Sequence, residues 1–273
     1  MGPPDPPPVL ILAANRTGQR DSVAAAANVS HKCLAPLAGR PMIAHVISAL
    51  IDAARFSTLY VSIDDVTVPS TVPELQPVLA DGRLRVLQSR ETLAASVAAA
   101  VEEIAPISGR CPPLVVTTGD NALHTPALLQ SFAERFAGGS GDVAVAFARE
   151  AVVRETVAEP PMRFHRLSDG GVSSCNLYGL RTQAALKALH VFDGGGQFAK
   201  RPGRILKTFG ALPFVLYKLR WTSSDRLMSL LGRRLGVSVD TLYLPFGYGP
   251  IDIDNEISYG LGQRLLEARL RSG

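Results

Sequence analysis

Residues 9–42 read VLILAANRTGQRDSVAAAANVSHKCLAPLAGRPM, and this stretch decides the fold. It opens with four apolar residues, Val9 to Leu12, without polar alternation, which predicts a strand buried on both faces of a mainly parallel sheet. The loop that follows carries three cationic side chains, Arg16, Arg20 and Lys32. Ligands of open α/β sheets bind at the carboxyl ends of the strands, so this loop predicts a site for an anion such as phosphate.

The backbone of the loop suits the same purpose. Asn15 tolerates left-handed backbone angles and Gly18 adopts them freely, so amide N–H groups can turn toward an anion while the cationic side chains supply charge. The alternative is a solvated surface loop with ordinary basic residues.

Length and composition bound the class of protein. The 273 residues are 47% hydrophobic and 19% charged, which favours one large α/β domain, with or without an accessory part. The net charge of +4 and the scattered arginines indicate no nucleic-acid partner. Three cysteines far apart argue against zinc and disulfides and favour a reducing compartment, the cytoplasm. We recognise no transmembrane or signal segment and expect a monomer or homodimer.

Strand and helix patterns alternate through the first half, as in a doubly wound parallel sheet. The expected strands are residues 9–13, 58–63, 84–88, 114–118 and 143–148, and the expected helices are residues 41–54, 92–104 and 126–136. We therefore divide the chain into a disordered, Pro-rich leader (residues 1–8), a first half (9–148) and a second half (149–273), within one continuous domain.

The pattern changes after Arg149. Residues 163–167 and 172–180 predict an antiparallel pair around the Asp169-Gly170 turn. Two or three helices are expected over residues 182–235. A strand over 237–244, a short segment over 251–255 and a terminal helix over 256–272 return the chain to the sheet.

The residue order resembles the signature of nucleotidyltransferases, specifically the molybdenum-cofactor-guanylyltransferase-like NTP transferases. That signature runs L-x-(A/G)-G-x-G-x-R, then P-K, then L-x-G-(R/K)-P-(M/L)-I-x-H-(V/I). Here the corresponding segments are residues 12–20, 31–32 and 37–46, and the third matches closely. Asn15 and Thr17 replace glycines, one extra residue precedes Arg20, and His31 replaces proline. The resemblance implies a Rossmann-like mixed α/β sheet, the glycosyltransferase-A-like nucleotidyltransferase fold, with a helical and hairpin part for the acceptor. It makes residues 9–148 the nucleotide-binding half and residues 149–273 the acceptor-binding half.

Nucleotidyl transfer to a phosphate needs a divalent ion, because the attacking and leaving oxygens are both anionic, and Mg²⁺ prefers oxygen ligands. By the resemblance, Asp120 and Asp254 bind the metal, with Asp252 as a further candidate. The alternative is that Asp120 is a turn or capping residue and that Asp254-Asn255 caps the last helix. The expected catalytic cations on the triphosphate are Lys32, Arg20 and Arg16.

Further residues are expected to contact the nucleotide. These are Leu12, Ala13, Ala14, Asn15, Gly18 and Gly119, and also Arg90 and Ser96 by resemblance to a loop near the base. For Arg90 and Ser96 a plain helix start, with Ser89 or Thr92 as N-cap, is an equal alternative. His31 and His45 are expected to serve packing or hydrogen bonding.

The acceptor side has weaker signals. Asn176 resembles a residue facing the acceptor, and Lys200 with Arg201 could hold its phosphate, although a solvated helix end explains that pair as well. Residues 209–221, FGALPFVLYKLRW, are read first as core or a subunit contact and second as a peripheral membrane helix.

Three functions compete. The first is a magnesium-dependent nucleotidyltransferase that joins an NTP to a phosphorylated small molecule and releases pyrophosphate. The second is a glycosyltransferase-like nucleotide-sugar enzyme, and the third is a noncatalytic nucleotide-binding module. The first strand is followed by no G-x-G-x-x-G, which disfavours a dinucleotide oxidoreductase.

Overall fold

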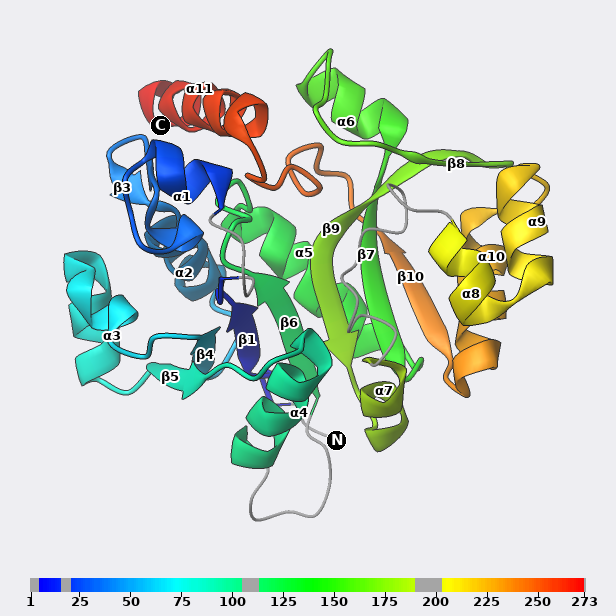
Figure 1. The fold of residues 1–273 in the computed structure, drawn as a ribbon, viewed down its shortest axis with the longest axis horizontal. Coiled ribbons are helices and arrows are strands. Elements are labelled where there is room, and N and C mark those ends of the chain that lie inside the picture. The colour runs from blue at the N-terminus through cyan, green and yellow to red at the C-terminus, as the bar shows by residue number, and fades with distance from the viewer. Residues whose placement is uncertain (1–4, 16–20, 105–112, 190–202, 273) are drawn as a thin grey trace.

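The computed structural model describes residues 5–15, 21–104, 113–189 and 203–272. These residues form an α/β fold with a central sheet flanked by helices (Figure 1). The sheet has eight strands within the described residues, in the order β10-β7-β9-β6-β1-β4-β5, with β8 paired to β9. The strands are β1 (Val9–Leu12), β4 (Leu59–Ile63), β5 (Leu84–Gln88), β6 (Leu114–Thr118), β7 (Val143–Arg149), β8 (His165–Leu167), β9 (Gly170–Leu180) and β10 (Val239–Tyr243).

Most neighbouring strands are parallel, and β9 is the exception. β1 pairs in parallel with both β4 and β6, β4 with β5, and β7 with β10. β9 lies between β6 and β7 and is antiparallel to both. The doubly wound sheet predicted from the alternating pattern is therefore confirmed, and it is mixed, as the family resemblance implies.

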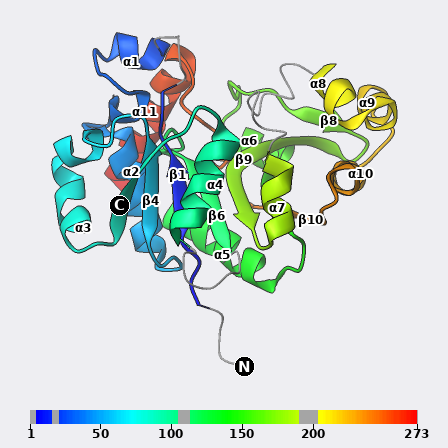
Figure 2. The same ribbon diagram turned by 60° about the horizontal axis from the view of Figure 1, so that its bottom comes forward.

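The two faces of the sheet are covered by different helices, α2 (Met42–Ala53) and α5 (Pro126–Gly138) on one and α4 (Leu93–Ile104) and α7 (Gln183–Ala188) on the other. Figure 2 shows α4 and α7 in front of the strands. Val9 and Ile11 belong to the core cluster with α2 and α5, whereas Leu10 belongs to the cluster with α4 and α7. β1 is thus buried on both faces, as its unbroken apolar run predicts.

Shorter elements surround the carboxyl end of β1. They are α1 (Ser22–Ala26), the 3₁₀ turn η1 (Lys32–Leu34) and the two-stranded β2 (Pro36–Leu37) and β3 (Arg40–Pro41). Further short elements follow β4 and β7, namely η2 (Val68–Thr71), η3 (Pro73–Leu75), α3 (Gln76–Ala80) and α6 (Glu150–Thr156). The sequence analysis missed these elements, because segments of two to seven residues show too little of a period to recognise.

The second half contains α8 (Gly203–Phe209), α9 (Ala211–Lys218), α10 (Ser224–Leu235) and the terminal α11 (Glu256–Ser272). Four helices, α7 to α10, thus lie in the described part of residues 182–235, where two or three were predicted. The additional helix arises because the chain breaks at Gly210, between α8 and α9. Gly210 has a φ of 88°, which is accessible mainly to glycine. Residues 251–255 form a loop. No helix of the described residues combines the length and the apolar character needed to cross a membrane.

The leader is described only from residue 5. Its last two carbonyls already bond to the fold: Pro7 accepts a hydrogen bond from the Ser57 N–H at 3.2 Å, and Pro8 accepts one from the Val115 N–H at 3.0 Å. The ordered chain therefore begins before Val9, and residues 1–4 lie outside the described residues.

Candidate active site

A cavity of about 390 Å³ extends from the carboxyl end of β6 along β9, which is antiparallel to it. Three carboxylates line it, Asp120, Asp252 and Asp254, together with the polar side chains of Thr118 and Asn176. Asp120 follows β6, and the other two aspartates precede α11, so segments far apart in the sequence supply one site.

Lys32 lies between two of these carboxylates. The Asp21 carboxylate accepts hydrogen bonds from Val23 and Ala24 and so caps α1, after which the chain turns to begin η1 at Lys32. The Lys32 Nζ atom lies 2.6 Å from Asp120 Oδ2 and 2.8 Å from Asp254 Oδ1. The Lys32 side chain is only 17% exposed. One cation therefore connects the amino-terminal loop with both distant acidic segments.

The protonation state of Lys32 follows from these contacts. Burial by itself would lower the pKa of the ammonium group, but the charges of Asp120 and Asp254 outweigh burial and raise the pKa well above its ordinary value. Lys32 thus carries a permanent positive charge at neutral pH.

Neighbouring residues cap the helices that follow the two carboxylates. Thr125 caps α5 by accepting a hydrogen bond from the Leu128 N–H, and Asn255 caps α11 by accepting from the N–H groups of Ile257 and Ser258. The two segments are joined by a backbone hydrogen bond of 3.2 Å from the Ile253 N–H to the Asp120 carbonyl. Asp120 and Asp254 can therefore both face Lys32.

Asp252 differs from the other two aspartates. Burial, and then the charges of Asp254 and Asp120, raise the pKa of its carboxyl group to about 7. The cluster already holds two carboxylates around one ammonium group, so further negative charge there is unfavourable without another cation.

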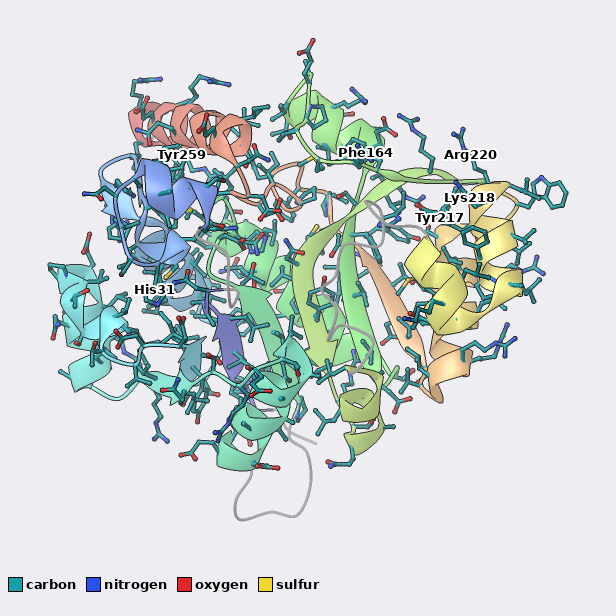
Figure 3. The ribbon with its side chains drawn as sticks, in the orientation of Figure 1. His31, Phe164, Tyr217, Lys218, Arg220 and Tyr259 are labelled. Carbon is teal, nitrogen blue, oxygen red and sulfur yellow. The ribbon has the colours of Figure 1, made fainter. Side chains whose placement is uncertain are left out.

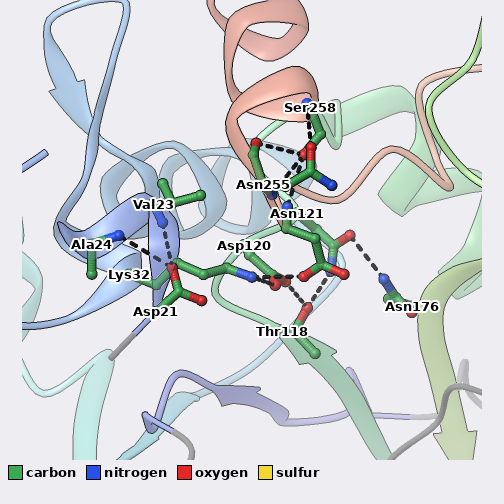
Figure 4. Close-up of polar contacts among 11 residues, drawn as sticks. Asp21, Val23, Ala24, Lys32, Thr118, Asp120, Asn121, Asn176, Asn255 and Ser258 are labelled. Carbon is green, nitrogen blue, oxygen red and sulfur yellow. Dashed lines mark hydrogen bonds and ion pairs between the residues drawn. The ribbon is translucent and has the colours of Figure 1, made fainter. Parts of the chain in front are cut away.

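Asn176 connects β9 to this cluster. It has a left-handed φ of 50°, at the point where the register between β7 and β9 shifts, and asparagine tolerates such angles better than most residues. Its Nδ2 donates to Asn121 Oδ1 at 3.3 Å, Asn121 in turn donates to the Thr118 hydroxyl, and Thr118 donates to Asp120 (Figure 4). The sequence analysis assigned no role to Thr118 or Asn121, although both belong to the polar TTGDN run (residues 117–121) in which β6 ends.

Two of the departures from the signature, Asn15 and His31, share one partner. The Asn15 N–H donates to Asp64 Oδ1 at 3.0 Å, and His31 Nε2 lies 3.2 Å from the same oxygen. The Asn15 side chain also donates to the Ser30 carbonyl at 3.0 Å. Asp64, which follows β4 and was not anticipated, thus ties the loop after β1 to the residue before Lys32. His45 likewise bonds locally, to the Leu37 carbonyl at 2.8 Å.

The end of β1 packs closely against the end of β6. The Gly119 N–H donates to the Leu12 carbonyl at 2.9 Å, and a Cβ atom at Gly119 would lie 3.2 Å from the Cβ of Ala13 and 3.4 Å from that of Cys33. Glycine therefore lets β1, η1 and β6 meet at one edge. Leu12 lines the cavity, and Ala14 is exposed.

Arg90 and Ser96 lie at the start of α4. The Ser96 hydroxyl accepts from the Arg90 N–H at 2.8 Å and donates to the Thr92 carbonyl at 3.0 Å. Thr92 accepts from the Ala95 N–H at 3.1 Å, as an N-cap does. Ser96 is buried and holds the loop, while the neighbouring Leu93 and Val97 reach the cavity.

Five predicted site residues lie outside the described residues: Arg16, Gly18, Arg20, Lys200 and Arg201. The cluster described above therefore consists of Lys32, the three aspartates and Asn176, with Thr118 and Asn121 as positioning residues.

Fitness for a divalent ion follows from the donor set. No group of three or more His, Cys, Asp and Glu side chains in the described ranges forms a ready-made metal cage. Mg²⁺, however, is usually held by one or two carboxylates together with substrate phosphates and water. Asp120 and Asp254 already share one cation, so this pair of carboxylates fits such an ion.

His124 is hydrogen-bonded to the backbone just before the loop that carries Asp252 and Asp254. It is buried, and its Nε2 lies 3.0 Å from the Gly249 carbonyl, three residues before Asp252. Burial lowers its pKa from 6.5 to about 4, so the imidazole is neutral and donates this hydrogen bond.

We predict a pH-dependent stability from His124. As the pH falls, His124 is protonated in the unfolded chain, near pH 6.5, before it is protonated in the folded protein, near pH 4. The contribution of the neutral imidazole to the unfolding free energy is therefore complete above pH 6.5 and is lost as the pH falls toward 4. Between pH 7.5 and pH 5 this histidine should cost about 2 kcal/mol of unfolding free energy. Urea unfolding of the wild type and His124→Gln at both pH values checks this, and the variant should lose less stability on acidification. Equal losses in the two proteins would contradict the assignment.

The fold is of the Rossmann-like α/β class, and at the carboxyl edge of β6 one lysine lies between two aspartates. The chain belongs to the MobA-like NTP transferase domain family, which residues 9–211 match. A comparison with curated proteins gives no match.

Solved structures with this fold include a hypothetical transferase from Thermus thermophilus, with a TM-score of 0.73 and 22% identity over 93% of this chain and 99% of that one. A 4-diphosphocytidyl-2C-methyl-D-erythritol synthase from Anaerococcus prevotii has a TM-score of 0.57 and 9% identity over 96% and 99%. A CMP:2-keto-3-deoxy-manno-octonic acid synthetase complexed with CTP has a TM-score of 0.56 and 16% identity over 96% and 99%. The fold is thus the glycosyltransferase-A-like fold of nucleotidyltransferases.

Proposed function

We propose that this protein transfers a nucleoside monophosphate from an NTP to a phosphorylated small molecule and releases pyrophosphate. The observation that carries the proposal is the position of Lys32, a permanently charged ammonium group held between Asp120 and Asp254 at the carboxyl edge of the sheet. Family membership supports the same chemistry. The synthase and synthetase with this fold are named for nucleotidyl products, and one of them was solved with CTP.

In the proposed reaction an acceptor phosphate oxygen forms a bond to the α-phosphorus, and the bond from that phosphorus to the bridging oxygen of pyrophosphate breaks. The second pKa of a phosphomonoester is near 6, so at neutral pH the acceptor is largely a dianion and needs little help from a base. This fits a cavity lined by carboxylates and amides. Catalysis then depends on position and charge.

Each residue of the cluster has a proposed task. Lys32 would bind triphosphate oxygens and stabilise the negative charge that develops on them as pyrophosphate leaves. Arg20 and Arg16 remain predicted to bind the triphosphate together with Lys32. Asp120 and Asp254 would hold a magnesium ion, which would neutralise charge on the α-phosphate. Asn176, anchored through Asn121, would orient the acceptor.

The apolar walls of the cavity indicate what kind of acceptor fits. These walls include Leu93 and Val97 of α4 and Leu189 after α7. Leu180 also lines the cavity and pairs with Leu114, the first residue of β6, so the cavity extends along β9 away from Asp120. Such walls suit an acceptor that carries an apolar group as well as a phosphate.

The test is to incubate the protein with each NTP, Mg²⁺ and a panel of phosphorylated acceptors, and to measure pyrophosphate. The panel should include sugar phosphates, glycerol and polyol phosphates, and phosphates with an apolar group. We expect release with one base and one acceptor class, and its loss in Lys32→Ala and Asp120→Ala. Release that persists in both variants would refute the site. Nucleotide binding without release over the panel would favour a binding module.

A further inference from the structure

Helices α8 and α9 expose a row of large apolar side chains. On α9, Leu212, Val215 and Leu219 recur at intervals of three and four residues, so they share one face of the helix. We define the α8–α9 surface by its five exposed apolar residues, which are Leu206 (44% exposed), Leu212 (54%), Val215 (44%), Leu219 (48%) and Trp221 (69%). A row of this kind, rather than single scattered residues, marks a surface for interaction.

The opposite face of α9 is fixed to the protein. Pro213 is buried, and the Tyr217 hydroxyl lies 3.1 Å from His165 Nδ1 of β8, with the two rings in an edge contact. Next to α9, Leu227 of α10 packs into the cluster formed by β7, β8 and β9. The apolar row therefore faces outward because its helix is anchored on the other side.

Positive charge accompanies the apolar row. Residues 203–236 contain seven basic residues (Lys and Arg) and one acidic residue (Asp225). The whole chain contains 28 basic and 24 acidic residues, so the remaining residues include 21 basic and 23 acidic ones. This one segment thus accounts for all of the positive net charge. Lys207, Lys218 and Arg220 are exposed beside the apolar residues, and Figure 3 shows Lys218 and Arg220 at the end of α9.

Charge decides which occupant fits. A second copy of the chain would place two strongly positive surfaces against each other, which is unfavourable. An anionic lipid surface supplies the opposite charge to the lysines and arginines, and its interface accommodates leucine and tryptophan side chains. We propose that the α8–α9 surface binds the protein to anionic membranes.

This surface lies beside the candidate active site. His165, which contacts Tyr217 of α9, also lines the cavity together with Arg163. Binding through α8 and α9 would therefore bring the cavity close to the lipid surface. The proposal depends on the surface alone and not on the reaction.

The test is flotation of the full chain with vesicles of phosphatidylcholine alone or mixed equally with phosphatidylglycerol. We expect binding to the anionic vesicles, weak binding to the neutral ones, and release as salt is raised, because salt screens the charges. Two double variants, Leu212→Ser with Trp221→Ser and Lys218→Glu with Arg220→Glu, should each weaken binding by about tenfold or more.

The matched controls lie on α11. Leu270 is 66% exposed and Arg271 is also exposed, so Leu270→Ser with Arg271→Glu removes the same kinds of side chain elsewhere. Circular dichroism checks that each variant is folded. No binding to anionic vesicles, equal weakening in the α11 variant, or a dimer in light scattering that only the α8–α9 variants lose would overturn the proposal. Pyrophosphate release is a separate readout, so either proposal can fail alone.

Discussion

Lys32→Met is expected to reduce pyrophosphate release by on the order of 10³-fold, because it removes a preorganised positive charge from the position where phosphate charge develops. Methionine keeps most of the length of the side chain, so packing changes little. The loss should appear mainly in kcat/KM for the NTP, measured by steady-state pyrophosphate release at saturating acceptor. Lys32→Arg should recover part of the activity only, since a guanidinium group does not fit between two carboxylates spaced for an ammonium group.

The matched control is Lys218→Met on α9. Lys218 is exposed and lies outside the residues that line the cavity. Its activity with soluble substrates should stay within about twofold of the wild type, as expected for a surface position. If Lys32→Met retains one tenth or more of the pyrophosphate release of the wild type, the role assigned to Lys32 is wrong.

The fold could largely be predicted from the chain because its main elements carry strong patterns. β5, β6 and α11 begin and end at the predicted residues, β1 and α4 differ from the prediction by one residue at one end, and α2 differs by one residue at each end. Apolar runs of four or five residues and helical periods of twelve or more decide these elements locally. The position of β9 between β6 and β7 is different, since local pattern specifies that a strand exists but not which strands it pairs with.

The cluster was predictable only in part. Lys32, Asp120 and Asp254 could be named from motif resemblance, and the structure brings them together, while their role in catalysis remains a prediction. Asp64 and His124 could not be named, because their contacts depend on how distant segments pack. His124 in particular is a lone histidine, and only burial against Gly249 distinguishes it from a surface residue.

Asp254→Asn separates a structural from a catalytic role for the ion pair. Alone, it should lower pyrophosphate release by on the order of 10²-fold and raise the magnesium concentration needed for half-maximal rate, since one hard oxygen ligand loses its charge. Lys32→Met alone leaves Asp120 and Asp254, 19% and 32% exposed, without their shared cation. That loss should cost about 2 kcal/mol of unfolding free energy, somewhat less than for a fully buried pair.

The double variant, Lys32→Met with Asp254→Asn, decides between the two roles. Removing one carboxylate relieves the repulsion between Asp120 and Asp254 that the missing cation leaves. The loss of unfolding free energy in the double variant should therefore be smaller, by at least about 1 kcal/mol, than the sum of the losses in the two single variants. Its activity should nevertheless stay as low as that of Lys32→Met, because the triphosphate still lacks the ammonium group. Recovery of activity together with stability would mean that Lys32 only neutralises the aspartates, and the proposed contact with the triphosphate would then be wrong.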